Sequence, residues 1–203
     1  MKIICVGRNY VDHIAELANE KPTDPVLFLK PDTAILDKEK NFYLPKFSND
    51  VHHEIELVFK IGKVGKNIDA KFAYKYIDSY GIGIDFTARD VQSKLKEKGL
   101  PWEKAKAFDS SAYISSFKPF SDEILQNPIH FKLIKNKQLV QSGNSDLMIW
   151  KLDVLIQEIS KYFTLKTGDL IFTGTPAGVG AVQANDVLEG YLEEEKLFEL
   201  NIL

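Results

Sequence analysis

The sequence holds a single cysteine, Cys5, among its 203 residues. One cysteine cannot form an internal disulfide, so the fold does not depend on an oxidising compartment. Cys5 lies in an apolar run, which is typical of a buried thiol on a strand. We therefore expect a fold without covalent cross-links, and a cytoplasmic location fits this composition.

Long apolar runs and blocks of positive charge are also lacking. No run approaches the roughly 20 apolar residues that cross a bilayer. The short apolar run at residues 2–6 predicts a first strand rather than a secretory signal, which needs a longer run and a small-residue cleavage site. The formal net charge is −3 without a basic cluster, whereas phosphate recognition needs a concentrated positive face. We expect neither nucleic acid nor a membrane as a partner.

The chain contains no repeat, low-complexity segment or Ser/Gly-rich linker. Its length suits one large core, so we predict a single domain over residues 1–203. Apolar residues recur at helical spacing over residues 145–163, where Asn144 or Ser145 can cap the start. Further helices are predicted over residues 88–98, 11–19 and 69–76. In the first of these, Thr87 and Asp90 form a capping box.

Strand patterns occupy much of the remaining sequence. Short apolar runs bounded by glycine, asparagine or charged residues lie at residues 79–85, 129–134, 138–141, 170–173, 187–192 and 197–203. The second and third runs predict a hairpin around Asn136. Because these strands do not alternate regularly with long helices, a doubly wound sheet is disfavoured. We predict an α+β fold with a mixed, largely antiparallel sheet.

Two glutamates interrupt the apolar stretch V-H-H-E-I-E-L-V-F-K at residues 51–60. Side chains two apart in a strand point the same way, roughly 6.6 Å apart, so Glu54 and Glu56 share one face and Ile55 faces the core. A buried carboxylate without a partner costs several kcal/mol. Either both acids face water or a cation lies between them, and the spacing alone leaves both interpretations open.

A third acid favours the cation. Asp85 ends the run G-I-G-I-D, in which Gly81 and Gly83 permit close backbone approach. Three carboxylates form an all-oxygen site, which is typical of Mg²⁺, Mn²⁺ or Ca²⁺ rather than zinc. No third nitrogen or sulfur ligand follows His52 and His53 at a zinc spacing. We interpret one of these histidines as outer support for the site and the other as a surface residue.

Several further side chains are candidates for chemistry. His13 and Glu16 are three apart and would share a helix face, where a carboxylate raises the basicity of an imidazole. The same spacing also occurs on exposed helix faces. Arg89 and Gln92 follow Asp85, and arginine suits a planar carboxylate.

Two more candidates lie further along the chain. Lys106 could neutralise a developing enolate or lie on the surface. Thr175, in the Gly-rich stretch at residues 173–180, could offer its hydroxyl to an anion or form a structural turn. That stretch lacks the ending of a phosphate-binding loop, so we reject a nucleotide site.

The candidate residues lie in short motifs that follow one another along the chain. They are V-G-R-N-Y with D-H-x-x-E, L-F-L-K-P, H-H-E-x-E, D-x-T-A-R-D-V-Q, G-L-P-W with K-x-F-D, and G-D-x-I-x-T-G-T-P-x-G-V-G. The ordered set resembles the fumarylacetoacetate hydrolase family, and within it the single-domain acylpyruvase and oxaloacetate decarboxylase branch. The resemblance extends from about Ile3 to the C-terminus.

The resemblance implies a fold, a site and an activity. The fold would be a mixed, mostly antiparallel β-roll with a few peripheral helices, usually as a homodimer. The site would comprise a Mg²⁺ or Mn²⁺ ion on Glu54, Glu56 and Asp85, catalytic His13, Glu16 and Lys106, and substrate-binding Arg89, Gln92 and Thr175. The dyad of His13 and Glu16 would lie on a mobile lid. The segment at residues 16–25 is polar and contains proline, and we predict that it is a lid that orders on ligand binding.

The implied reaction is cleavage of C–C bonds in small 2-oxo acids, by acylpyruvate hydrolysis or oxaloacetate decarboxylation, through a metal-stabilised enolate. Three alternatives stay open at this point. One is an isomerase or hydratase of 2-hydroxy-diene-dioates, and another is a non-catalytic metabolite-binding protein. The third is a purely structural metal site, which the number of polar candidates around the acids disfavours.

Overall fold

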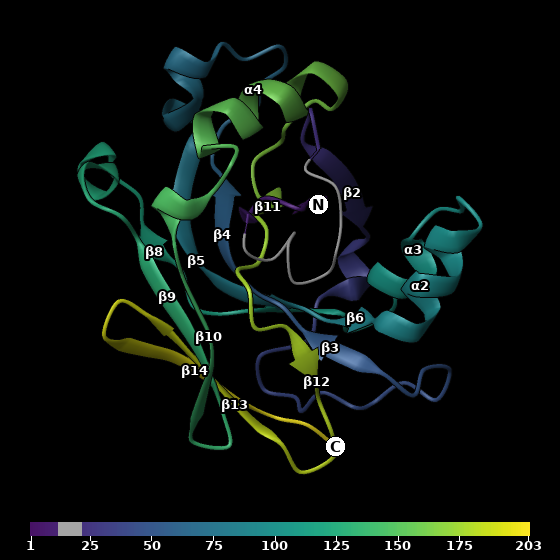
Figure 1. Cartoon of the computed structure of the whole chain (residues 1–203). Helices are drawn as coiled ribbons and strands as arrows, with labels where there is room; N and C mark the ends of the chain where they lie inside the picture. Colours follow the sequence, from purple (N-terminus) through teal and green to yellow (C-terminus); the bar gives the residue numbers. More distant parts are fainter. Residues whose placement is uncertain (12–21) are drawn as a thin grey trace.

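The computed structural model of the chain describes residues 1–11 and 22–203, and strands dominate it (Figure 1). The predicted pair His13 and Glu16, all but the first residue of the helix expected at residues 11–19, and most of the lid expected at residues 16–25 therefore lie outside the described residues. Among the helices that are described, none is long and apolar enough to cross a membrane.

The largest sheet has β4 (Ile55–Ile61) and β5 (Ile77–Asp85) side by side near its centre. Its strand order is β2-β1-β11-β4-β5-β7, and β8 also pairs with β5. The other strands are β1 (Ile3–Gly7), β2 (Val26–Lys30), β7 (Ala112–Ile114), β8 (Lys118–Pro119) and β11 (Leu170–Phe172). Since β1 and β11 run parallel while β4 and β5 run antiparallel, the sheet is mixed, as the sequence predicted.

Two smaller sheets complete the β structure of the described residues. A four-stranded antiparallel sheet has the order β10-β9-β13-β14, and a three-stranded one has the order β12-β3-β6. Their strands are β3 (Val51–His53), β6 (Thr87–Ala88), β9 (His130–Lys135), β10 (Gln138–Asn144), β12 (Gly180–Ala181), β13 (Val187–Leu192) and β14 (Glu195–Asn201). The predicted hairpin is confirmed, because β9 and β10 pair around Asn136 and Lys137, whose φ values are 51° and 67°. Such left-handed pairs suit a tight hairpin turn.

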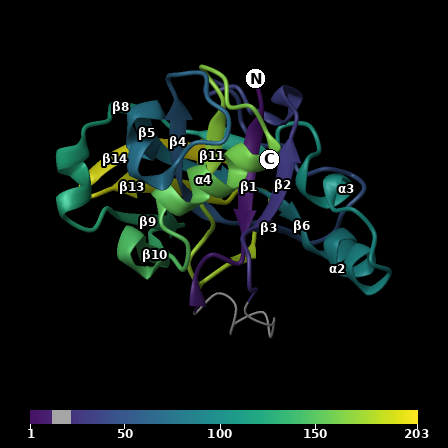
Figure 2. The ribbon, with the colours of Figure 1, turned by 90° about the horizontal axis from the view of Figure 1, so that it is seen from above.

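Helices lie around the sheets rather than between strands. They are α2 (Arg89–Glu97), α3 (Glu103–Lys106) and α4 (Leu152–Tyr162), with 3₁₀ segments η1 (Asp32–Ala34), η2 (Ala70–Tyr76), η3 (Asp122–Gln126) and η4 (Ser145–Leu147). Figure 2 shows α2 and α3 together at one end of the molecule, away from β13 and β14. One face of α4, including Leu155 and Ile159, is buried in the main core. This arrangement is the α+β fold that the sequence predicted.

The helix predicted over residues 145–163 begins later than expected. The side chain of Asn144 does act as a cap, but it caps only the short η4. The chain then bends at residues 149–150 before α4 starts at Leu152. The cause is tertiary, because Asn9 holds this stretch through its carbonyl, which accepts from Ile149 N, and its Oδ1, which accepts from Trp150 N at 2.7 Å.

The predicted capping box at α2 is wrong. The N-cap is Ala88, which offers no side-chain bond. Asp90 instead accepts hydrogen bonds from Ser48 Oγ at 2.6 Å and Asn49 N at 3.1 Å, so it fastens the helix to the preceding loop. The segment predicted as a helix at residues 69–76 forms the 3₁₀ segment η2.

Candidate active site

Three carboxylates from different places in the fold converge. Glu54, Glu56 and Asp85 each offer an oxygen, and these oxygens all lie within 4.8 Å of one another. All three residues are buried, at 4 %, 2 % and 0 % exposure. The two glutamates do not share one continuous strand, because the chain leaves β3 and enters β4 at Glu54. Glu54 O accepts a hydrogen bond from Asp85 N at 2.9 Å, which joins the two segments at this point.

Gly81 and Gly83 let the backbone of β5 approach its neighbours closely, as the sequence predicted. A Cβ on Gly83 would lie 2.6 Å from Tyr113 O, and one on Gly81 would lie 2.8 Å from Ser115 Oγ. Both separations are shorter than real Cβ contacts allow. The bare backbone therefore lets β5 pack closely against its neighbours and carry Asp85 to the acidic group.

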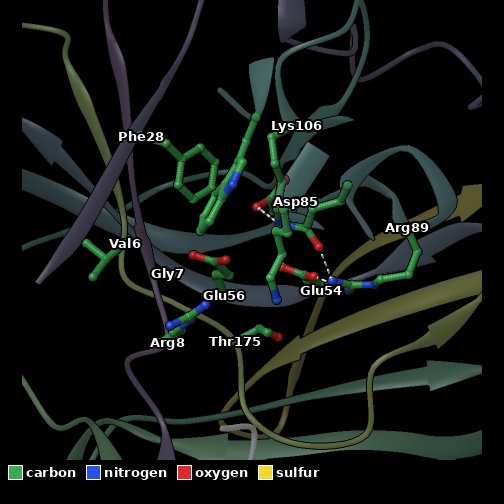
Figure 3. A pocket seen from close by; sticks show the side chains of 13 residues that line it. Val6, Gly7, Arg8, Phe28, Glu54, Glu56, Asp85, Arg89, Lys106 and Thr175 are labelled. Carbon is green, nitrogen blue, oxygen red and sulfur yellow. Dashed lines mark hydrogen bonds and ion pairs between the residues drawn. The ribbon is translucent and has the colours of Figure 1, made fainter. Parts of the chain in front are cut away.

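Lys106, at the end of α3, lies between two of the acids (Figure 3). Its Nζ donates to Glu54 Oε2 and Asp85 Oδ2, each at 2.7 Å, and to Thr87 Oγ1 at 2.6 Å. Burial alone would lower the pKa of this lysine, but the charges of Asp85 and Glu54 outweigh burial and raise the pKa above its ordinary value. Lys106 is thus a fixed positive charge rather than a surface lysine.

Arg89 and Gln92 also belong to the site. Arg89, the first residue of α2, pairs through Nη2 with Glu54 and donates through Nη1 to Gln92 Oε1 at 2.7 Å. Its Nε donates to His52 Nδ1 at 3.4 Å. The spacing of three residues places both side chains on one face of α2.

A second buried lysine, Lys30, forms an ion pair with Asp85 and was not among the predicted site residues. Lys30 ends β2 with a fully buried side chain, and its Nζ lies 2.7 Å from Asp85 Oδ1. The same ammonium donates to the carbonyl of Lys106 and to Ser111 Oγ at 2.9 Å. A cation at the end of the apolar run V-L-F-L-K was the available signal, since a charge in such a strand needs a buried partner.

Glu56 differs from the other two acids, because it has no ion pair with any described residue. Its Oε2 accepts one hydrogen bond, from Gly174 N at 2.7 Å. Burial, followed by the charges of Asp85 and Glu54, raises the pKa of Glu56 well above its ordinary value. A cation placed among these oxygens would relieve that repulsion. The all-oxygen donor set fits a hard divalent ion.

Thr175 lies in the pocket, but its hydroxyl is already engaged. Oγ1 donates to Ile55 O at 2.7 Å and accepts from Gln141 Nε2 at 2.8 Å. In this arrangement the hydroxyl hydrogen points at the backbone of β4. Binding a substrate carboxylate through that hydrogen would require Thr175 to exchange acceptors.

Neither histidine of the V-H-H-E motif is a surface residue, so that part of the interpretation was wrong. His53 is 1 % exposed and contacts Gln141 Oε1 through Nδ1 at 3.0 Å. Burial lowers the pKa of His53 to about 4, so its ring is neutral at pH 7. His52 is half-buried between Asp50, which contacts its Nε2 at 2.9 Å, and Arg89. His52 contacts Arg89, which pairs with Glu54. His53 contacts Gln141, which also accepts from the backbone of Ile55.

Arg8 lines the pocket but was not among the predicted site residues. It follows β1 with a φ of 59°, a conformation that is uncommon for arginine. Figure 3 shows its side chain beside Glu56 and Thr175. Arg8 has no hydrogen-bond or ion-pair partner in residues 1–11 and 22–203. Its charge is therefore available to a ligand.

One pocket unites these groups. Among the described residues it is lined by Val6, Gly7, Arg8, Phe28, Glu54, Glu56, Asp85, Arg89, Gln92, Lys96, Trp102, Lys106 and Thr175. All the sequence-predicted site residues that the structure describes are therefore brought together. Apolar walls come from Phe28, whose ring centre lies 5.3 Å from Lys106 Nζ, and from Trp102.

The chain is similar in sequence to enzymes that act on oxaloacetate, according to the names of those relatives. The chain is 44 % identical over 189 residues to an oxaloacetate tautomerase of Escherichia coli (strain K12), covering 92 % of this chain and 86 % of that one. It is 44 % identical over 190 residues to a mitochondrial oxaloacetate decarboxylase of Dictyostelium discoideum, covering 93 % and 87 %.

A solved structure extends the comparison to the fold. The fumarylpyruvate hydrolase from Pseudomonas aeruginosa, in complex with Mn²⁺ and pyruvate, superposes with a TM-score of 0.93 at 33 % identity, covering 100 % of this chain and 89 % of that one. The family model for the fumarylacetoacetate (FAA) hydrolase C-terminal region matches residues 2–200. Sequence, site and fold agree, and the chain belongs to the fumarylacetoacetate hydrolase family.

Proposed function

We propose that this protein is a divalent-metal-dependent enzyme that cleaves C–C bonds of small 2-oxo acids, by oxaloacetate decarboxylation or acylpyruvate hydrolysis. The observation that carries the proposal is the convergence of three buried carboxylates with the charged Lys106 in one pocket. The names of the relatives, an oxaloacetate decarboxylase and a fumarylpyruvate hydrolase, support it.

Glu54, Glu56 and Asp85 would hold the metal ion. Among the described residues the buried Glu56 has no ion pair, which supports this role, as do the burial and the repulsion by Asp85 and Glu54 that raise its pKa. Mg²⁺ and Mn²⁺ both suit an all-oxygen site. When bound, such an ion supplies Lewis-acid stabilisation of negative charge that develops on oxygen. The Mn²⁺ in the related fumarylpyruvate hydrolase makes Mn²⁺ the first ion to test.

The cationic side chains would bind and polarise the substrate. Arg8 and Arg89 lie at the pocket wall and suit carboxylates. Lys106 would lie beside the negative charge that appears on the 2-oxo oxygen. In decarboxylation the bond between C3 and the distal carboxylate breaks, CO₂ leaves, and the electron pair forms the enolate of pyruvate. A fixed ammonium at that oxygen lowers the barrier because it needs no reorganisation.

His13 and Glu16 would serve the hydrolytic reaction. Glu16 would orient His13, which takes a proton from water as the water oxygen attacks the distal carbonyl of an acylpyruvate. The C–C bond then breaks, leaving a carboxylic acid and the same pyruvate enolate. Decarboxylation needs no attacking water, so it depends less on this pair.

Keto–enol tautomerisation of oxaloacetate is a second candidate. It is favoured by the 44 % identity to an oxaloacetate tautomerase. Removal of a proton from C3 gives an enolate of oxaloacetate, which is then protonated on oxygen. Stabilisation by Lys106 would serve this reaction as well, so the pocket suits both candidates.

A turnover panel tests the proposal. Purified protein is incubated with oxaloacetate, acetylpyruvate, fumarylpyruvate and 2-hydroxyhepta-2,4-diene-1,7-dioate, with Mn²⁺ or with a chelator. Metal-dependent release of pyruvate supports C–C cleavage, whereas a change in the enol absorbance of oxaloacetate without pyruvate favours tautomerisation. Turnover of the diene-dioate alone would indicate an isomerase, and a ligand-induced melting shift without turnover would indicate a binding protein. The homodimer, the single domain and the cytoplasmic location stay predictions.

A further inference from the structure

Gln141 is a buried amide whose hydrogen-bonding capacity is fully used, and the mechanism above does not involve it. It is 1 % exposed. Its Oε1 accepts from Ile55 N at 3.1 Å and contacts His53 Nδ1 at 3.0 Å. Its Nε2 donates to Thr175 Oγ1 at 2.8 Å and to Pro176 O at 3.0 Å. One side chain therefore joins the β3–β4 junction to the loop after β11.

The orientation of this amide follows from its partners. Ile55 N can only donate and Pro176 O can only accept, so Oε1 must face β4 and Nε2 must face the loop. His53 then carries its hydrogen on Nδ1, because the amide oxygen accepts from it. The Thr175 hydroxyl receives a hydrogen from Gln141 and gives its own to Ile55 O. The network has one consistent arrangement of hydrogens.

A β-bulge delivers Gln141 to this position. Leu139 and Gln141 are two residues apart, so in a regular strand they would face the same side. Leu139 is 61 % exposed, whereas Gln141 is buried. The pairing of β10 with β9 shifts between these residues, since Leu139 pairs with Ile134 and Gln141 with Leu133. The extra residue turns Gln141 inward, which bulges beside active sites commonly do.

We propose that Gln141 is a positioning residue for the acidic group and for Thr175. It holds His53 and Ile55, the neighbours of Glu54 on both sides, where the chain passes from one sheet to another. It also fixes the direction of the Thr175 hydroxyl. Through the backbone it sets where Glu54 and Glu56 present their oxygens. The inference deepens the proposed function, since it rests on the metal site assigned there.

Mn²⁺ binding to the purified protein tests the inference directly. Gln141→Met keeps a similar volume and removes all four contacts, and Gln141→Asn keeps the amide but shortens its reach. Calorimetric titration with Mn²⁺ gives the affinity, and thermal melting verifies that each variant is folded. We expect Gln141→Met to lower the Mn²⁺ affinity about 10- to 100-fold, as the loss of residues that orient metal ligands commonly does. Gln141→Asn should also lower it.

Ser160→Ala is the matched control. Ser160 is fully buried on α4 and also holds a backbone N–H, that of Ile68, at 2.8 Å. This variant should lower the melting temperature but leave the Mn²⁺ affinity unchanged. Folded Gln141→Met and Gln141→Asn with wild-type affinity would overturn the inference, as would wild-type protein that binds no Mn²⁺. Wild-type protein that binds Mn²⁺ but turns over no 2-oxo acid would reject only the proposed reaction, because the affinity comparison still decides the role of Gln141.

Discussion

Lys106 and Asp85, 21 residues apart in the chain, form a buried ion pair in which Nζ lies 2.7 Å from Oδ2. The same ammonium is equally close to Glu54 Oε2. A protein cation therefore already neutralises part of the acidic group. The contribution of Lys106 to catalysis can therefore be tested separately from metal binding.

Replacing Lys106 should slow the reaction without weakening metal binding. Lys106→Met removes the fixed charge beside the developing enolate, and loss of such a group costs a factor of roughly 10² to 10³ in kcat. Because a competing cation is lost from the carboxylates, the Mn²⁺ affinity should not fall. Steady-state kinetics with oxaloacetate and Mn²⁺ calorimetry measure the two quantities. Parallel losses in both would contradict the assigned role.

Added Mn²⁺ should stabilise the protein through Glu56. At about 100 times its Kd, a ligand that binds only the folded state adds about 2.7 kcal/mol, which for a chain of this size corresponds to a melting shift of about 5–10 °C. Glu56→Gln should abolish that shift. Glu194→Gln is the control, because Glu194 has a 97 % exposed side chain and should leave the shift intact. Equal shifts in all three proteins would remove Glu56 from the metal site.

Arg8 should select substrates with a second carboxylate. Its side chain has no partner among the described residues, and a hydrogen bond to a charged group contributes about 1.5–3 kcal/mol. Arg8→Gln should therefore lower kcat/KM for fumarylpyruvate about ten- to a hundredfold while changing acetylpyruvate much less. Lys98→Gln removes the same charge from an exposed position at the end of α2. An identical loss for both substrates would show that Arg8 does not contact the second carboxylate.

Glu16 should matter for hydrolysis more than for decarboxylation. If it orients His13 as a general base, Glu16→Ala should lower acylpyruvate hydrolysis by roughly 10² to 10⁴ and leave the Mn²⁺ affinity intact. Decarboxylation of oxaloacetate should fall less, since no water is activated. Glu20→Ala, a change of another acid in the same predicted lid, serves as the control. Loss of metal affinity in Glu16→Ala would reject the separation of roles.

A pair outside the site should give a pH-dependent contribution to stability. Burial would raise the pKa of Asp169, but bonds from the Lys2 ammonium and from the N–H groups of Lys2 and Lys166 outweigh it and lower that pKa. A lowered pKa in the folded state means that the stabilisation is present above the ordinary value and is lost as the pH falls through the lowered one.

Urea unfolding of Lys2→Met measures this contribution. The variant should be less stable by about 1.5–3 kcal/mol at pH 7, since a hydrogen bond to a charged group is lost. The deficit should shrink as the pH falls below 3.8, the ordinary value for aspartate. Lys71→Met, which removes an exposed partner of Asp69, should change little at any pH. A deficit that stays constant from pH 7 to pH 2.5 would contradict the assignment.

The sequence by itself predicted which of the described side chains gather in the pocket. The acid at the end of a glycine-rich strand and the Arg–Gln spacing of three each fix where a side chain lies within a single element, because strands repeat every two residues and helices every 3.6. The sequence likewise determined the α+β class and the β9–β10 hairpin, whose signals are local. For the same reason it could not anticipate that Asn9 delays the start of α4, since that contact joins residues 141 apart.

The tertiary structure alone decided how the acids are held. Whether Glu54 continues a strand or marks a passage between sheets depends on which strands pair, and pairing joins distant segments. Lys30 reaches Asp85 from another strand, and Gln141 reaches Ile55 across 86 residues only because a bulge reverses its direction. Register and bulges depend on how one strand packs against its neighbour. The spacing of residues along one strand does not reveal that packing.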